Sequence, residues 1–464
     1  MVGHGGQSGL QQVFGSLHDG DASVLNIDLE ANGQLIAQVQ KEIQRFKDDK
    51  SIEQMVEAEN FHNGSWTRFN MLVVSFLKFC RDVNPWSVSE SADLIFELYQ
   101  GLGNCLLNDT YPVQELVQLY CTMTEYVVKM SRRLDSHYCH LGTRKHQFLT
   151  ITTAVISKVF NSVKPHHDEA FVSFEDLSQK QQILLYLANK LNNCYILMGS
   201  SSSCANIFKN VKPKSALSQF SEFPLRERVE YRYLLGRYYL LNHRVSNAFH
   251  QLNSAFSLLA TQRTMSDPLR RNMRRVLKFL VPASMMFGKL PSTQLVAEID
   301  PALAHMYVGL IHAIKSGHFD SFYQWLYEHE LQLRSDCLLL LLLEKIPVLL
   351  YRNLVRRIVR ELCIPQNSNK LPYGVVQNIL EVSLRRRLGE PQLPLIYTAV
   401  HDPANVENVL ETLVNLTLFR ANCFPLSNQC VFSKTTNISS IFPPVNEKLT
   451  ALFPLNGEDS WLDT

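Results

Sequence analysis

The chain has 464 residues, enough for roughly two to four domains of average size or for one long array of repeats. Hydrophobic residues make up 46% of it and charged residues 19%, which excludes wholesale disorder, collagen and low-complexity sequence. Lysine and arginine together number 45, and aspartate and glutamate 43, so the net charge of +2 argues neither for nor against a polyanionic partner.

No segment of the sequence is apolar enough to predict a membrane span. The longest apolar run, residues 337–343, ends at Glu344, whereas a spanning helix needs about 20 residues. The first residues lack the charged start and apolar run of a secretory signal, so we expect a nuclear or cytosolic protein. The ten cysteines include no Cys-x-x-Cys pair, and we expect free, mostly buried thiols.

The first half of the chain is predicted to be helical after a flexible start. Residues 1–25 are glycine-rich, show no helical period and are expected to be mobile. From residue 26 to residue 225, apolar residues recur at spacings of three and four between proline and glycine breaks, which is typical of helical repeats. The predicted helices are 33–47, 68–82, 87–107, 113–134, 145–163 and 179–198.

A helical hairpin of the tetratricopeptide kind is predicted from residue 226. Gly236, Tyr239 and Ala248 stand where such a repeat places its glycine, tyrosine and alanine. The small residues Gly236 and Ala248 allow two antiparallel helices to approach closely. We take residues 226–362 as the helical part of a second domain, with further helices at 268–286, 303–316, 319–330, 336–343 and 347–362.

Residues 363–442 are predicted to form a winged helix. A helix from residue 371 to 384 and another at 405–418 precede two β-prone segments, 418–424 and 429–433. Two helices followed by a β-hairpin are typical of this fold, and the turn around residues 425–428 would be the wing. Residues 443–464 form a C-terminal tail with an acidic end. The predicted fold class is therefore all-α, a tetratricopeptide-like solenoid that ends in a winged helix with a small β-hairpin.

Basic residues concentrate in two windows of the second half. Residues 226–289 hold 12 basic and 3 acidic side chains, and residues 345–387 hold 9 and 2. The second window has four arginines at helical spacing and three more in a row, and two further basic residues border the predicted wing. Such groups can neutralise nucleic-acid phosphates, or they can be solvated surface that pairs with Glu344 and Glu361. The nucleic-acid candidates are Arg352, Arg356, Arg357, Arg360, Arg385, Arg386, Arg387, Arg420 and Lys434.

The second helix of the predicted winged helix is a poor reader of the DNA major groove, because it carries Glu407 and Glu411 but no lysine or arginine. We therefore predict that any nucleic-acid contact is made mainly through phosphates. For this helix we favour contact with a protein partner. The partner-binding candidates on its apolar face are Val406, Val409, Leu410 and Leu413.

The sequence does not indicate an enzyme. It has no Gly-Lys-Ser/Thr phosphate loop, no Gly-x-Ser-x-Gly elbow and no His-Glu-x-x-His helix. His137, Cys139, His140 and His146 are the best metal candidates, but on a helix these side chains point to different sides. We therefore predict no catalytic residues, no metal and no cofactor.

Helical repeats that run into a winged helix resemble the PCI domain, which is shared by subunits of the proteasome lid, the signalosome and an initiation factor. More narrowly, the sequence is similar to the Thp-type PCI proteins of fungi, whose animal counterpart is the second PCI-domain-containing protein. The resemblance covers residues 25–455. It rests on the segments 81–87, 93–97, 143–149, 189–193, 229–239, 342–347, 351–354, 405–410 and 420–425.

The resemblance implies a non-enzymatic subunit of TREX-two, a complex at the nuclear pore that couples transcription to mRNA export. It also implies two protein partners, a large Sac-type helical scaffold and a small acidic Sem-type protein. The winged helices of the two PCI subunits would lie side by side and bind RNA or DNA. The acidic Sem-type protein would suit the same arginines, which is a rival use for them. An architectural PCI subunit of a signalosome- or splicing-associated complex, without direct nucleic-acid binding, is the alternative function.

Overall fold

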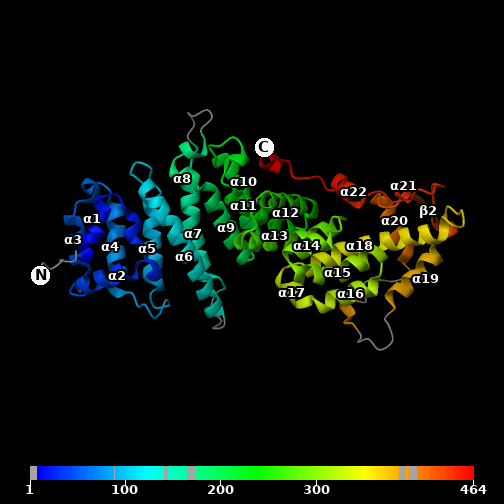
Figure 1. The fold of residues 1–464 in the computed structure, drawn as a ribbon, viewed down its shortest axis with the longest axis horizontal. Helices are drawn as coiled ribbons and strands as arrows, with labels where there is room; N and C mark the ends of the chain where they lie inside the picture. Colours follow the sequence, from blue (N-terminus) through cyan, green and yellow to red (C-terminus); the bar gives the residue numbers. More distant parts are fainter. Residues whose placement is uncertain are drawn as a thin grey trace. The chain divides into compact units, whose positions relative to one another are not determined.

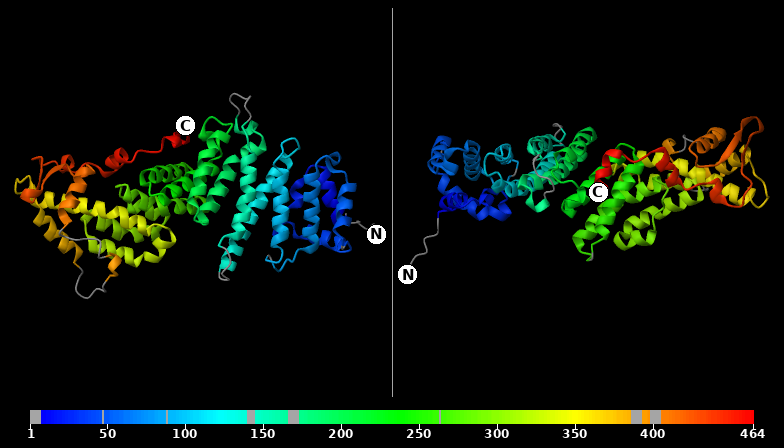
Figure 2. Two further views of the ribbon diagram at one scale, coloured as in Figure 1. Left: turned by 180° about the vertical axis from the view of Figure 1, so that it is seen from behind. Right: turned by 90° about the horizontal axis from the view of Figure 1, so that it is seen from above.

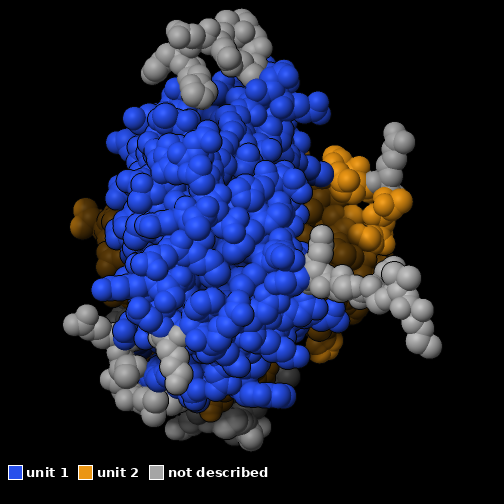
Figure 3. Space-filling view, turned by 90° about the vertical axis from the view of Figure 1, so that its left-hand side faces the viewer, with its two compact units in different colours: residues 1–231, 461–464 blue, residues 232–460 orange. Residues whose placement is uncertain are grey.

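A computed structural model describes residues 8–46, 48–87, 89–139, 145–165, 173–262, 264–385, 393–397 and 405–464. These residues fold into helices and one small sheet, which confirms the predicted all-α class. The chain divides into two compact units, which Figure 3 colours separately. Unit 1 comprises Met1–Tyr231 with Trp461–Thr464, and unit 2 comprises Arg232–Ser460. Among the described residues, no helix is long and apolar enough to cross a membrane.

The helices of unit 1 follow one another so that most of them pack against a helix that is near in sequence (Figures 1 and 2). The predicted helix at 179–198 is divided into two helices, and the other predicted helices are present with bounds that differ by a few residues. The helices are α1 (Gly9–His18), α2 (Leu29–Ile43), α3 (Asp49–Ala58), α4 (Thr67–Asp82), α5 (Ala92–Cys105), α6 (Gln114–Tyr138), α7 (Gln147–Ser162), α8 (Gln179–Gln182), α9 (Leu184–Leu197), α10 (Ser201–Lys214) and the beginning of α11 (Leu225–Leu241).

The expectation of a mobile N-terminal segment is wrong for helix α1. Leu10, Val13, Phe14 and Leu17 are buried, and their spacing of three, one and three residues places them on one face of the helix. The glycines and glutamines between them obscured this period in the sequence. Close packing on α2 explains why a glycine opens the helix, since a Cβ at Gly9 would lie 3.0 Å from the side chain of Gln38.

The Glu42 carboxylate of α2 holds the beginning of α1. It accepts hydrogen bonds from Ser8 Oγ (2.5 Å) and from the backbone N–H groups of Gly9 (2.7 Å) and Leu10 (3.1 Å). The hydrogen bond from Ser8 is the main cause that lowers the pKa of Glu42 below its usual value. The carboxylate therefore supplies the acceptors that the first turn of α1 needs.

Acidification is expected to loosen α1, because the folded protein favours the ionised form of Glu42. A carboxyl group whose pKa is lowered by folding stabilises the fold above its unfolded pKa, and this contribution is lost as the pH falls through the folded value. Glu42→Gln should weaken the docking of α1 by about 1 kcal/mol already at pH 7. Hydrogen exchange of a peptide that covers residues 9–18 measures this. The exposed Glu30→Gln variant is the control, and equal exchange in both variants would contradict the assignment.

Helices α11 and α12 (Val245–Ala260) form the predicted close hairpin. A Cβ at Gly236 would lie 2.6 Å from Leu252 Cγ, so this position requires glycine. Tyr239, Ala248 and Leu252 are buried between the helices and their neighbours, as expected for this kind of repeat.

The other helices of the solenoid in unit 2 are α13 (Asp267–Met286), α14 (Thr293–Ile299), α15 (Pro301–Ser316), α16 (Phe319–Glu328), α17 (Glu330–Ser335) and α18 (Leu339–Ile358). The predicted break before Pro347 is wrong, because α18 continues through this proline. Leu342, Ile346, Leu349 and Leu350 on either side of it are buried. Their packing outweighs the cost of a proline inside a helix, about 3 kcal/mol, which comes from one lost hydrogen bond and from the clash of the ring with the preceding turn. A π-helical turn, η6 (Val359–Cys363), then ends the helix.

The winged helix is present in unit 2, with one more strand than the predicted hairpin. Its elements are β1 (Lys370–Pro372), α19 (Tyr373–Leu384), α20 (Val406–Asn415), β2 (Ala421–Phe424) and β3 (Gln429–Phe432). The strands form an antiparallel sheet in the order β1-β3-β2, in which Cys430 of β3 lies between Leu371 of β1 and Cys423 of β2. Strand β1 has three residues, which is too short to show an alternating pattern in the sequence.

Side-chain hydrogen bonds lock the winged helix to the turn between α15 and α16. Ser383 Oγ of α19 donates to Gly317 O (3.1 Å) and accepts from Phe319 N (2.9 Å). Asn353 of α18 donates to Ile314 O at 2.7 Å. These hydrogen bonds join α18 and α19 to the same turn.

After the winged helix, the chain up to Ser460 returns along the helices of unit 2 instead of projecting from the winged helix (Figures 1 and 2). The segment includes α21 (Ile438–Ile441), α22 (Val445–Leu452) and η10 (Gly457–Asp463). A Cβ at Gly288 would lie 2.5 Å from Val445 Cβ, and Tyr239 OH donates to Asp459 Oδ2 at 2.5 Å. Burial raises the pKa of Asp459. The acidic end of the chain is thus part of the packed structure.

Candidate nucleic-acid interface

Three of the arginines predicted on α18 and η6 lie at or near the surface. Arg356 is half-buried, and the side chains of Arg357 and Arg360 are 53% and 56% exposed. Both exposed arginines pair with Glu361. The distance to Glu361 Oε1 is 3.3 Å from Arg357 Nε and 2.8 Å from Arg360 Nη2. The hydrogen bond from Arg360 is the main cause that lowers the pKa of Glu361. Exposed pairs of this kind contribute little stability, so a phosphate can replace the carboxylate at small cost.

Arg352 does not share the exposed side of this helix, and our expectation that it does is wrong. It is 8% exposed, and its Nη2 donates to the carbonyl oxygens of Phe442 (3.3 Å) and Pro443 (2.8 Å). Its guanidinium carbon lies 5.8 Å from the centre of the Phe442 ring. Burial lowers the pKa of Arg352 to about 10. The side chain joins α18 to the segment after α21 and cannot reach a phosphate in the folded protein.

Arg385 is exposed at the end of α19, where it is the C-cap residue. Arg386 and Arg387, the other two members of the predicted cluster, lie outside the described residues. A positive side chain at the C-terminus of a helix interacts favourably with the helix dipole. This interaction gives Arg385 a structural role that does not require a nucleic acid.

The two remaining candidates are exposed beside the β-hairpin. Arg420 precedes β2, where its N–H donates to Ile441 O (2.9 Å) and its Nη1 to Ser440 O (3.4 Å). Lys434 follows β3 and is exposed. The wing between the strands is a short 3-10 turn, η9 (Pro425–Ser427), in which Leu426 is fully exposed. Two cations thus stand at the base of an exposed wing.

The apolar face of α20 is part of the core of unit 2, which corrects its assignment to a partner. Val406, Leu410 and Leu413 are at most 3% exposed, and α20 packs against α18, α19 and β2. Val409 is half-buried. An amphipathic pattern shows that a helix face is buried, but it does not distinguish burial within the domain from burial by another chain.

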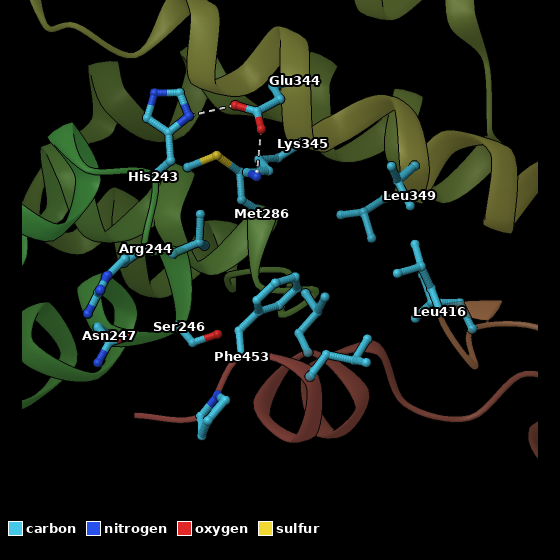
Figure 4. Close-up of a pocket in the computed structure, with 16 residues that line it drawn as sticks. His243, Arg244, Ser246, Asn247, Met286, Glu344, Lys345, Leu349, Leu416 and Phe453 are labelled. Atoms are coloured by element: carbon cyan, nitrogen blue, oxygen red, sulfur yellow. Dashed lines mark hydrogen bonds and ion pairs between the residues drawn. The ribbon is translucent and has the colours of Figure 1, made fainter. Parts of the chain in front are cut away.

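A cavity of about 580 Å³ lies in unit 2 between the α11–α12 turn, α18 and the segment around α22. Figure 4 shows Glu344 at its edge, with Leu349, Leu416 and Phe453 among the apolar side chains that line it. Glu344 Oε2 lies 2.6 Å from His243 Nδ1, and Glu344 Oε1 lies 2.8 Å from Lys345 Nζ. Both contacts lower the pKa of Glu344, and the hydrogen bond from Lys345 is the larger cause. From the sequence, Glu344 was predicted only as a possible partner for arginines.

The structure also shows a group of exposed basic side chains for which the sequence predicted no site. They belong to the window 226–289, and several of them lie on the exposed side of α13. Their helical spacing in the sequence, with arginines at 270, 271, 274 and 275, was the signal that could have identified a common face.

The histidine and cysteine candidates form no metal site within the described part of the chain, where no three ligating side chains come together. Cys139 is exposed after α6, and His146 is the N-cap residue of α7. His140 lies outside the described residues.

Helical repeats that lead into a winged helix with strand order β1-β3-β2 define the chain as a PCI-domain protein. It is 41% identical over 457 residues to the nuclear mRNA export protein THP1 of Saccharomyces cerevisiae. The aligned residues make up 97% of this chain and 99% of that protein. The chain therefore belongs to the Thp-type family of PCI-domain proteins.

Two further relatives match over shorter ranges. The PCI domain-containing protein 2 homolog of Drosophila melanogaster is 32% identical over 192 residues, which are 41% of this chain and 42% of that protein. The CSN12 homolog of Schizosaccharomyces pombe is 29% identical over 199 residues, 43% of this chain and 44% of that protein. No protein-family model matches the chain.

Proposed function

We propose that the protein is a non-enzymatic adaptor subunit of a nuclear complex that couples transcription to mRNA export at the nuclear pore. The observation that carries this proposal is the 41% identity to a nuclear mRNA export protein over 97% of the chain. The match includes both units, so it is not limited to a common winged helix. The proposed partners are a large Sac-type helical scaffold and a small acidic Sem-type protein.

The test of the complex is affinity purification of the tagged protein from nuclear extract after nuclease treatment, followed by mass spectrometry. Recovery of a Sac-type scaffold and a Sem-type chain is expected, because the nuclease removes partners that are joined only through nucleic acid. The purified material could instead contain signalosome or splicing subunits and lack these two chains. That result would support the second candidate function, an architectural PCI subunit. The similarity to the CSN12 homolog is the observation that favours this alternative.

We also propose that the winged helix contributes to RNA or DNA binding through phosphates. Arg356, Arg357, Arg360, Arg385, Arg420 and Lys434 are at or near the surface and support this proposal, and Arg386 and Arg387 stay in it as sequence neighbours of Arg385. Arg352 is left out because its guanidinium is buried. The acidic residues Glu407 and Glu411 on α20 argue against contacts with base edges by this helix.

The double variant Arg356→Glu with Arg357→Glu is expected to weaken nucleic-acid binding at least about tenfold at 100 mM salt, because two phosphate contacts become repulsive. Fluorescence anisotropy with single-stranded RNA and with DNA, between about 50 and 200 mM salt, measures affinity and its salt dependence. The matched control is Arg356→Lys with Arg357→Lys, which keeps the charge. An unchanged affinity in the glutamate variant would exclude this surface but not the family assignment.

A further inference from the structure

Helix α13 presents an unusual row of cations on one side. Arg270, Arg271, Arg274 and Arg275 are exposed and Lys278 is half-buried. These residues lie at helical angles that span less than half a turn, so their side chains leave the same side of the helix. From Arg270 to Lys278 the row is about 12 Å long, given a rise of 1.5 Å per residue. The one acidic residue of the helix, Asp267, is in its first turn.

A cavity of about 480 Å³ opens beside the end of this row. Arg274, Arg275 and Lys278 line one side of it, and His305, Met306 and His329 line the other. Arg274 Nε donates to Ile299 O at 2.9 Å, which fixes the guanidinium while it leaves the two terminal nitrogens to other acceptors. The cavity thus combines oriented cations with two imidazole rings.

The carboxylates around this cavity do not neutralise the arginines. Asp300 is the N-cap of α15 and accepts from Leu303 N at 3.1 Å. Asp336 pairs with Lys278 Nζ at 2.6 Å. Within the described residues, no ion pair joins any of the four arginines of the row to a carboxylate. Lys278 is therefore paired, whereas the positive charges of the four arginines are not compensated by an ion pair in the described part of the chain.

We propose that the cationic face of α13 holds the phosphates of single-stranded RNA and that the cavity beside it receives an unstacked base. This inference rests on the proposed nucleic-acid binding and adds a second surface to the winged helix. Four of the five cations are arginines, whose planar fork pairs with phosphate oxygens in a bidentate manner. A row of about 12 Å fits several phosphates of one strand better than a single phosphate group. Histidine and arginine planes are surfaces on which splayed RNA bases stack.

The test uses the full-length protein and a 20-nucleotide oligouridylate, with affinity measured over a range of salt concentrations. Arg271→Glu with Arg275→Glu is expected to lower the affinity at least about tenfold at 100 mM salt and to reduce the salt slope by about 1.4, or 0.7 for each phosphate contact. Both side chains are exposed, so the variant should keep the melting temperature. The matched control is Lys209→Glu with Lys212→Glu, which changes two exposed lysines of α10 by the same charge.

A second variant, His305→Ala, separates the cavity from the charges. Loss of a stacking partner is expected to lower the affinity about tenfold without changing the salt slope. If this variant binds like wild type, the cavity does not hold a base, and that part of the proposal is wrong.

The outcomes distinguish this inference from the proposed function. If the α13 variant keeps the wild-type affinity and slope while the Arg356 and Arg357 variant loses affinity, α13 is excluded and the winged helix stands. If neither variant loses affinity, both surfaces are excluded, whatever partners the chain recovers from extract. If the α13 variant keeps RNA binding but loses binding of a polyglutamate peptide, the face serves an acidic protein, which overturns the RNA proposal.

Discussion

Replacement of Gly317 by alanine is expected to destabilise unit 2 by about 3 kcal/mol or more. Gly317 ends α15 with φ of +69°, a left-handed conformation that costs a residue with a Cβ about 1–2 kcal/mol. A Cβ here would also lie 2.5 Å from Leu354 N and 2.8 Å from Leu354 Cα. Because these are backbone atoms of α18, they cannot move aside as a flexible side chain would.

The consequence extends to the winged helix, because Gly317 O accepts from Ser383 Oγ of α19. A displaced turn would break this bond and the neighbouring bond from Asn353 to Ile314 O. Urea unfolding followed by intrinsic fluorescence measures the effect. Gly374→Ala is the matched control, since no atom lies within 4 Å of a Cβ at Gly374, in the first turn of α19. Equal unfolding midpoints for the two variants would show that the turn adapts.

Arg352→Ala is expected to destabilise the protein by about 2–4 kcal/mol, although the sequence grouped this residue with surface arginines. The substitution leaves the carbonyl oxygens of Phe442 and Pro443 without their donor and removes the packing of the guanidinium on the Phe442 ring. Arg352→Met keeps most of the apolar volume and isolates the hydrogen bonds, so it should lose about 1–2 kcal/mol.

The matched control for these variants is Arg357→Ala, which removes an exposed arginine from the same helix and should change stability by less than about 0.5 kcal/mol. Thermal unfolding of the three variants gives the comparison. A second comparison is the nucleic-acid affinity of the variants, measured at a temperature where all three are folded. Arg352→Met should then bind like wild type. Lower affinity of the folded Arg352→Met variant would mean that the guanidinium becomes accessible in the complex.

The site was less predictable than the fold, and α18 shows why. The four arginines at 352, 356, 357 and 360 are separated by four, one and three residues, a helical pattern that does not distinguish them. One of them is nevertheless buried, and two pair with Glu361. The two carbonyl groups that accept from Arg352 are 90 and 91 residues away in the sequence. On α20, the apolar residues Val406, Leu410 and Leu413 were correctly placed on one face, but that face is covered by the chain's own helices.

The spacing of apolar and small residues along the sequence was sufficient to predict the helical class, the close hairpin at Gly236 and the order of the two helices and the hairpin in the winged helix. These features depend on residues three or four apart, or on a turn between neighbouring segments, so the local pattern records them. The helix through Pro347, the short strand β1 and the burial of Arg352 depend on segments that are distant along the chain. Their energies come from packing and hydrogen bonds between such segments, and these contacts exist only once the chain has folded.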